Sequence, residues 1–140
     1  MRAMAAHPSL IRRGVDRLGI ALSAACAVHC VAGLALAAVL GLGATAVGTG
    51  ALATSTLGTA LLDPRIHEYG LMLAVAVGAL GLGVGAARHR QPGLLLLGLA
   101  GLALMSAGVL APHGPLEAGF TIPGVLLLAM AHLRNLRHAH

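Results

Sequence analysis

The residues with the most distinctive chemistry in this chain are its only two cysteines, Cys26 and Cys30, which flank His29 in the stretch CAVHC. They lie in a run that carries no charged residue from position 18 to position 62. If this run is helical, a spacing of four residues puts both thiols on one face, with Cβ atoms roughly 5–6 Å apart. Two sulfurs can then converge on one small ligand, and thiolates select soft metal ions over magnesium or calcium.

Other roles for the two cysteines fit this spacing less well. A disulfide within one straight helix would be strained, because both Cβ atoms point in similar directions. A buried cysteine is often an inert small hydrophobe, but ionisable groups in such an apolar stretch are costly and usually functional. The pattern therefore indicates a soft-metal site at Cys26 and Cys30, with His29 as a third ligand or as the base that takes a thiol proton.

The composition indicates that this site lies in a membrane protein. The chain is 58% hydrophobic and 9% charged, whereas soluble domains are roughly one quarter charged. A helix that crosses a bilayer needs about 20 mostly apolar residues. We predict an all-α membrane protein, a four-transmembrane-helix bundle, in which a basic segment 1–17 precedes a domain at 18–137 and a tail at 138–140. The predicted spans are residues 18–40, 66–87, 94–110 and 116–136.

The arginines predict the orientation of these spans. With four spans and cytoplasmic N- and C-termini, eight of the nine arginines lie on the cytoplasmic side, as the positive-inside rule requires. A fifth span within the Gly- and Thr-rich segment 41–62 would leave only five there, so this segment is predicted as an outer loop. Nucleic acid is not expected as a partner, because the positive-inside bias already explains the arginines. Aromatic residues that could stack on bases are also nearly absent, with Tyr69 and Phe120 as the only members of the Phe, Tyr and Trp class.

The position of the cysteines within the first span suggests a transit site. At about 1.5 Å per residue from Leu18, Cys26 and Cys30 lie roughly 12 and 18 Å into a hydrocarbon core about 30 Å thick. We therefore expect the pair near the midplane, where transporters commonly bind their substrates. Small residues at helical spacing in the second and third spans predict close packing between helices: Ala74, Gly78, Gly81, Gly85, Gly98, Gly101 and Gly108.

Polar residues in the later spans form a candidate ion path. His67 and Glu68 lie at the outer start of the second span, where they either attract a cation or cap the helix. His89 lies in the inner turn between the second and third spans. His132 lies near the inner end of the fourth span, followed by Asn135, and either meets a departing ion or hydrogen-bonds between helices.

Several further elements follow one another along the chain. They are Asp16, the CAVHC stretch, His67-Glu68, Arg88-His89-Arg90, the TIPG stretch at 121–124 and the AHLRN stretch at 131–135. Taken together, these elements resemble the MerC-type membrane proteins of bacterial mercury resistance. The resemblance implies a multi-pass protein of the bacterial inner membrane that takes up Hg(II), with Cys26 and Cys30 as ligands of the transported ion. It also implies a cytoplasmic thiol acceptor or mercuric reductase as partner, no permanent cofactor and no enzymatic activity.

Two other functions remain open at this point. One is haem binding in the bundle, with two of four histidines as axial ligands: His29, His67, His89 and His132. The other is a purely structural accessory subunit in which the cysteines have no chemical role.

Overall fold

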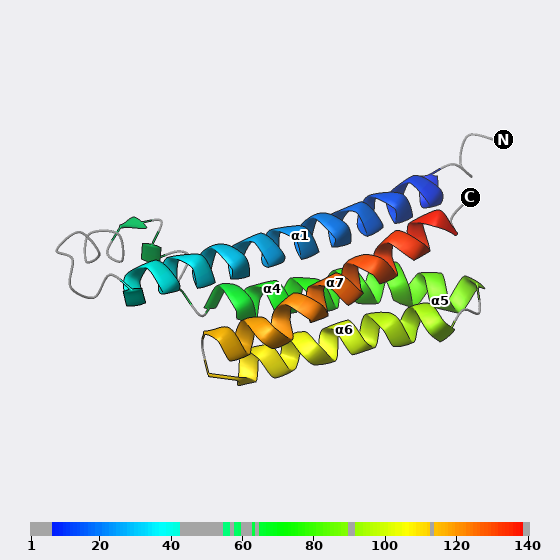
Figure 1. Cartoon of the computed structure of the whole chain (residues 1–140). Coiled ribbons are helices and arrows are strands. Elements are labelled where there is room, and N and C mark those ends of the chain that lie inside the picture. Colours follow the sequence, from blue (N-terminus) through cyan, green and yellow to red (C-terminus); the bar gives the residue numbers. More distant parts are fainter. Residues whose placement is uncertain are drawn as a thin grey trace.

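The computed structural model describes residues 7–42, 55–56, 58–59, 63, 65–89, 92–112 and 114–138 of the chain. These residues form helices and turns and contribute no strand. The helices of the bundle are α1 (His7–Leu42), α4 (Arg65–Gly78), α5 (Val84–His89), α6 (Pro92–Leu110) and α7 (Pro115–Arg137). A π-helical turn, η1 (Ala79–Gly83), joins α4 to α5, so that the three elements form one continuous rod (Figure 1).

Four helical stretches of the described chain are long and apolar enough to cross a membrane, which confirms the predicted all-helical class with four candidate spans. They are Leu10–Val39, Arg65–Ala87, Pro92–Leu110 and Pro115–Arg137. The first helix differs from the prediction because it begins at His7, so that part of the basic segment is helical. Most of the predicted outer loop 41–62 lies outside the described residues.

Local sequence explains where the later helices begin. Pro92 and Pro115 each open a helix, a position where the missing N–H is not needed and where the fixed φ of proline suits the helix. Glu68 and Glu117 lie in the first turns of α4 and α7, near the positive end of each helix dipole. Arg134 and Arg137 lie in the last turn of α7, where a cation is favourable.

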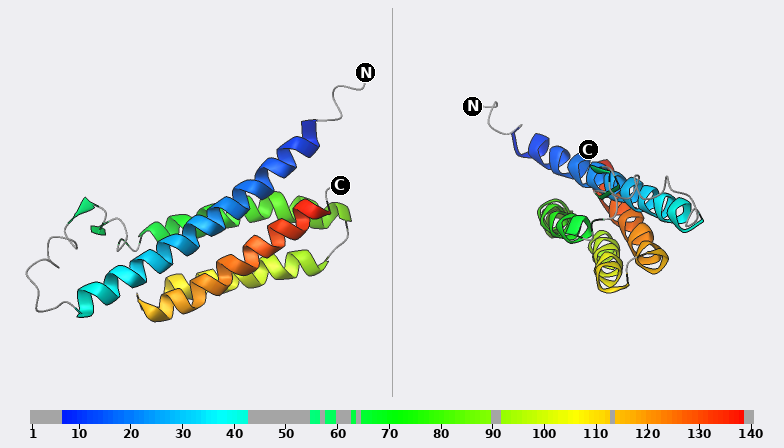
Figure 2. Two further views of the ribbon diagram at one scale, coloured as in Figure 1. Left: turned by 45° about the horizontal axis from the view of Figure 1, so that its top comes forward. Right: turned by 90° about the vertical axis from the view of Figure 1, so that its left-hand side faces the viewer.

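The helices alternate in direction and pack as a bundle. α7 makes its most extensive contacts with α6 and α1, and α4 lies against α1 and α6 on the other side (Figure 2). The start of α1 and the end of α7 lie at one end of the bundle, the terminal end, whereas α4 and α7 begin at the other, the far end (Figure 1). α1 has 36 residues, about 54 Å of helix, and extends past the first turns of α4 and α7 at the far end.

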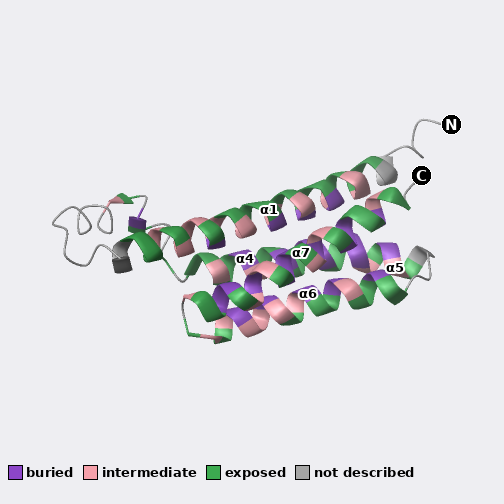
Figure 3. Ribbon diagram, viewed as in Figure 1, coloured by how far each residue is buried: buried purple, intermediate pink, exposed green. Residues whose placement is uncertain are grey.

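Burial follows the faces that the helices turn toward one another. The apolar core consists of six buried residues from α4, η1, α6 and α7: Ala74, Leu82, Met105, Val125, Leu128 and Ala131. The outward faces of the long helices are exposed (Figure 3). They carry large apolar side chains, such as Val28, Met72, Leu96 and Leu126. Apolar residues on the outside of a helical bundle suit a surface that faces lipid.

Glycines bring α6 and α7 into backbone contact, as the small-residue pattern of the third span predicts. A Cβ built on Gly101 would lie 2.8 Å from the Gly124 carbonyl oxygen, and a Cβ built on Gly124 would lie 2.8 Å from the Gly101 carbonyl oxygen. Gly98 faces Leu82 and Ala131, and Gly108 faces Thr121. This close approach gains dispersion contacts in a setting where helices have little hydrophobic drive to associate.

We expect Gly124→Ala to destabilise the protein by about 1–3 kcal/mol, because the new methyl group meets backbone atoms that cannot rotate away. The matched control is Gly119→Ala on the same helix, where a Cβ meets nothing within 4 Å. Thermal unfolding in detergent, followed by far-UV circular dichroism, would compare the two variants. Equal stability of both would show that the α6–α7 contact is looser than described.

Candidate functional site

The fully buried positions on the inward face of α1 carry small and polar residues. Between residues 10 and 39, where side chains of α1 are described, the buried residues are Asp16, Gly19, Ser23 and Cys30. Cys26 is half-buried on the same face. The spacings of three or four residues align these five positions along one side of the helix. α1 therefore turns a narrow polar track toward the bundle, beside Leu22 and Ala27, which pack partly buried against the core. Its exposed large apolar residues point outward.

Both cysteines of this track face helix α4. The sulfur of Cys30 lies 3.3 Å from Nε2 of His67, and Cys30 is only 5% exposed. The sulfur of Cys26 lies 3.3 Å from the position that a Cβ on Gly70 would occupy, one turn further along α4. Both cysteines are free thiols. The two sulfurs thus point into the bundle, and glycine at position 70 leaves room beside one of them.

A carboxylate on α7 extends the contact between Cys30 and His67. Nδ1 of His67 lies 3.0 Å from Oε1 of Glu117, a residue that is 5% exposed. The carboxylate lies at ion-pair distance from the imidazole, whose other nitrogen, Nε2, faces the thiol. The ring of His29 lies beside that of His67, with centroids 5.0 Å apart and planes tilted by 58°. A thiol, an imidazole and a carboxylate therefore link α1, α4 and α7.

The structure refines the predicted surroundings of the thiols. Cys30 contacts a residue in the first turn of α4, so the pair lies toward the far end and not midway along the bundle. The prediction counted depth from Leu18, but α1 begins earlier and extends past the other helices. Glu68, predicted beside His67, is exposed, whereas Glu117 was not predicted. In the described part of the chain, no three His, Cys, Asp or Glu side chains converge as a metal cage.

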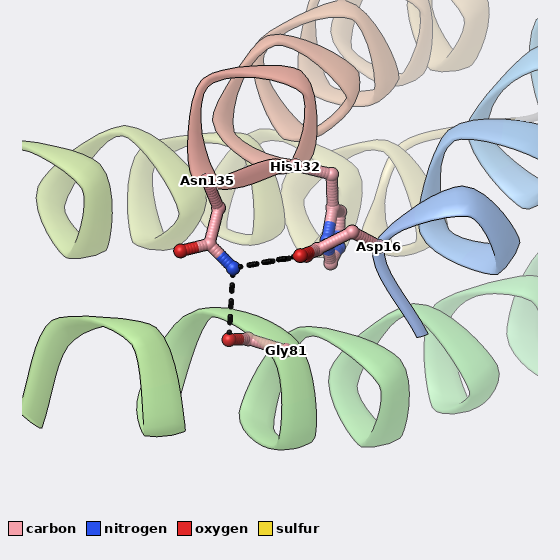
Figure 4. Close-up of polar contacts among 4 residues, drawn as sticks. All are labelled: Asp16, Gly81, His132 and Asn135. Atoms are coloured by element: carbon pink, nitrogen blue, oxygen red, sulfur yellow. Dashed lines mark hydrogen bonds and ion pairs between the residues drawn. The ribbon is translucent and has the colours of Figure 1, made fainter. Parts of the chain in front are cut away.

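A second polar cluster joins the helices toward the terminal end. Nδ1 of His132 lies 2.9 Å from Oδ1 of Asp16. The side-chain amide of Asn135 donates to both Asp16 oxygens, at 3.0 and 2.9 Å, and to the Gly81 carbonyl at 3.2 Å. Asp16, His132 and Asn135 each have 0% exposure. Figure 4 shows this polar network, in which α1 and α7 meet the π-helical turn.

Three glycines make the space that the polar network occupies. A Cβ on Gly19 would lie 2.5 Å from the His132 ring, and a Cβ on Gly81 would lie 3.0 Å from the Asp16 carboxylate. A Cβ on Gly85 would overlap the Asn135 amide. Sequence analysis attributed Gly81 and Gly85 to helix packing alone. The structure shows that they accommodate polar side chains from α1 and α7.

The network also gives new partners to residues predicted for an ion path. His132 and Asn135 are enclosed around Asp16, in agreement with the interhelical alternative for His132. Sequence analysis assigned no contact to Asp16. In the observed helix, which begins at His7, Asp16 lies on the same face as Cys30. His89 is the last residue of α5, and its side chain lies outside the described part.

The described part of the chain is a small helical bundle with four helices suited to a membrane and two free thiols that face α4. The chain belongs to the family of MerC mercury resistance proteins, whose family model matches residues 16–137. This match confirms the resemblance and connects the protein with mercury resistance and transport at a membrane, in a family that is not a known enzyme family. No curated protein and no solved structure matches the chain significantly.

A double-mutant cycle tests whether Gly85 is needed for the Asn135 amide. We expect Gly85→Ala and Asn135→Ala each to lower the free energy of unfolding. The loss in the double variant should be smaller than the sum of the two single losses by about 0.5–3 kcal/mol. The coupling arises because the shorter side chain at position 135 vacates the space that the new methyl group needs. Gly83→Ala, where a Cβ meets nothing within 4 Å, is the control. Additive effects measured by thermal unfolding would contradict this account.

Proposed function

We propose that the protein carries Hg(II), or a similar soft cation, inward across the bacterial inner membrane by way of Cys26 and Cys30. The observation that carries this proposal is the direction of the two sulfurs, which face α4 inside the bundle, with His67 3.3 Å from Cys30. Inert cysteines could equally well face lipid. Membership of the mercury resistance family supports mercury as the cargo.

The proposed orientation puts both termini in the cytoplasm and the far end in the periplasm. The arginines of α1 and of the last turn of α7 lie toward the terminal end, as basic residues do on the cytoplasmic side. In this orientation the thiols lie nearer the periplasmic mouth than the cytoplasmic one. An ion that arrives from outside then meets Cys30 and His67 early in its passage.

Capture of the ion requires the thiols to lose their protons. Two thiols that bind Hg²⁺ form a neutral bis-thiolate and release two protons, because metal binding and thiol deprotonation are linked. Nε2 of His67 lies where it can accept the proton of Cys30. Glu117 lies at ion-pair distance from Nδ1 and balances the charge of an imidazolium. Its role is to position His67, because its carboxylate contacts the ring of that histidine.

Release to the cytoplasm proceeds by exchange, because two thiolates hold a soft ion too tightly for simple dissociation. Attack by two acceptor thiols transfers Hg²⁺ to them, and their two protons return to Cys26 and Cys30. A small cytoplasmic thiol such as glutathione, or a mercuric reductase, supplies these groups. No permanent cofactor and no catalytic reaction by this chain is required.

The geometry does not favour haem binding. The rings of His29 and His67 lie against each other, with no separation for a macrocycle between them. His132 is bonded to Asp16 near the terminal end, far along the bundle from His67 near the far end. A structural accessory role is tested directly by removing the thiols.

We expect Cys26→Ser/Cys30→Ser to abolish Hg(II) uptake, because the double variant has no thiol left. Uptake of radioactive Hg(II) into cells or proteoliposomes would measure this, together with mercury hypersensitivity of cells that make the protein. Ala25→Ser is the matched control, since it puts the same hydroxyl on the exposed side of α1. Equal uptake by the double variant and the unaltered protein would reject the proposed function.

The same substitution at two glutamates tests the positioning role of Glu117. We expect Glu117→Gln to lower Hg(II) uptake about 10-fold or more, as loss of groups that orient metal ligands usually does. Glu68→Gln, which alters an exposed glutamate in the first turn of α4, should have the smaller effect. Equal losses in the two variants would indicate that both carboxylates act only by attracting cations to the far end.

A further inference from the structure

We propose that Asp16 and His132 form a buried proton-binding site, and that proton binding there is coupled to the cation held by Cys26 and Cys30. The site is distinct from the thiols and lies toward the other end of the bundle. Its coupling to transport rests on the proposed function, whereas the proton site itself does not.

The burial of the pair argues for a role beyond holding helices together. Asp16 and His132 both lie within candidate membrane spans and have 0% exposure. Ionisable side chains in such segments are expensive to bury and commonly mark proton relays. A well-packed apolar pair would usually stabilise the same contact at least as well. Three glycines nevertheless preserve the space for the polar side chains.

The hydrogen bonds indicate which group changes its charge. The amide of Asn135 can only donate through Nδ2, and it donates to both oxygens of Asp16. These bonds favour the ionised carboxylate. Nδ1–H of His132 then donates to Oδ1, and Nε2 remains as a buried atom with no hydrogen-bond partner among the described residues. One proton added at Nε2 converts an anionic pair into a neutral ion pair.

Among the described residues, the charged groups nearest the Asp16–His132 pair are on α1. From α7 the pair is faced by the uncharged Asn135, and from the rod of α4, η1 and α5 by Gly81 and Gly85. On α1, Gly19 faces His132, and the half-buried Arg12 and Arg13 precede Asp16 by four and three residues. Arg17 and Arg134 are exposed. Two cations of its own helix therefore lie within about one turn of Asp16, and His132 is the titratable group whose direct contact with the carboxylate is described.

Helix α1 provides the physical connection between the two sites. Asp16 and Cys30 share its inward face and are separated by 14 residues, about 21 Å of continuous helix. The buried Ser23 hydroxyl lies between them on this face. A change in charge at the pair alters how α1 is held against α7 and the π-helical turn. Because α1 is rigid, the same change reaches its contacts with His67 and Gly70, and coupling of this kind is reciprocal.

The first measurement reads the proton on His132 directly. Purified full-length protein with ¹⁵N-labelled histidine would be followed by NMR from about pH 5 to pH 8, the range in which histidine ordinarily changes charge. The His132 signals are identified by their loss in His132→Gln. We expect a change from one to two protonated ring nitrogens in the unaltered protein, and a different pH profile in Asp16→Asn, because the carboxylate in contact with the ring is then absent. A ring that keeps one protonation state throughout overturns the proposal.

The second measurement tests the coupling. Proteoliposomes would take up Hg(II) with and without a pH difference of one unit across the membrane. We expect the pH difference to change the Hg(II) uptake rate of the unaltered protein by roughly fivefold or more, the lower range of typical coupling. The uptake rate of Asp16→Asn should be the same with and without the pH difference. Asp63→Asn, at the exposed aspartate before α4, is the control and should keep it. Thermal unfolding confirms that each variant is folded, and His132→Gln repeats the test if Asp16→Asn is not.

The outcomes separate the two proposals. Uptake that needs the cysteines but keeps its pH response in Asp16→Asn and His132→Gln overturns the coupling and leaves the proposed function intact. Uptake that does not need the cysteines overturns the proposed function. In that case the NMR titration of His132 in the Cys26→Ser/Cys30→Ser variant still tests the proton site, since Asp16 and His132 do not contact the thiols.

Discussion

The contact of the Asp16 carboxylate with His132 and Asn135 is the buried polar contact that joins α1 to α7. The fully buried residues on the described inward face of α1 are an aspartate, a glycine, a serine and a cysteine, and Leu22 and Ala27 add partly buried apolar contacts with the core. The hydrogen bonds of Asp16 satisfy polar groups in a setting where an unsatisfied polar group is costly. Together with this packing they set the face that α1 turns toward α4, and with it the position of both cysteines.

The same arrangement explains why polar chemistry occurs at two places in an otherwise apolar bundle. At the far end, His67 and Glu117 contribute an imidazole and a carboxylate beside Cys30. Toward the terminal end, α7 contributes His132 and Asn135. α7 thus supplies partners for α1 at both positions, directly or through His67. The core of Val125, Leu128 and Ala131 separates these partners along α7.

Sequence reasoning identified what depends on neighbouring residues and missed what depends on distant ones. Apolar windows predict four helices, and the spacing of Cys26 and Cys30 predicts two thiols on one face, because both follow from helical periodicity. Glu117 could not be assigned, since its contact with His67 arises only when α4 and α7 pack together. Asp16 was placed at the edge of a span because the start of α1 was set at Leu18. The helix itself begins at His7, and the depth of the cysteines in the bilayer stays a prediction.

The π-helical turn sets the rotational register between the two halves of the second span. One turn of α-helix takes 3.6 residues, so each residue added to or removed from a rod rotates everything beyond it by about 100°. Ala79–Gly83 lies between His67 and Gly70 on one side and Gly85 on the other. In a regular α-helix through this stretch, His67 and Gly70 could face the cysteines only if Gly85 were rotated away from Asn135. A local irregularity of the backbone therefore lets a single rod serve both polar clusters.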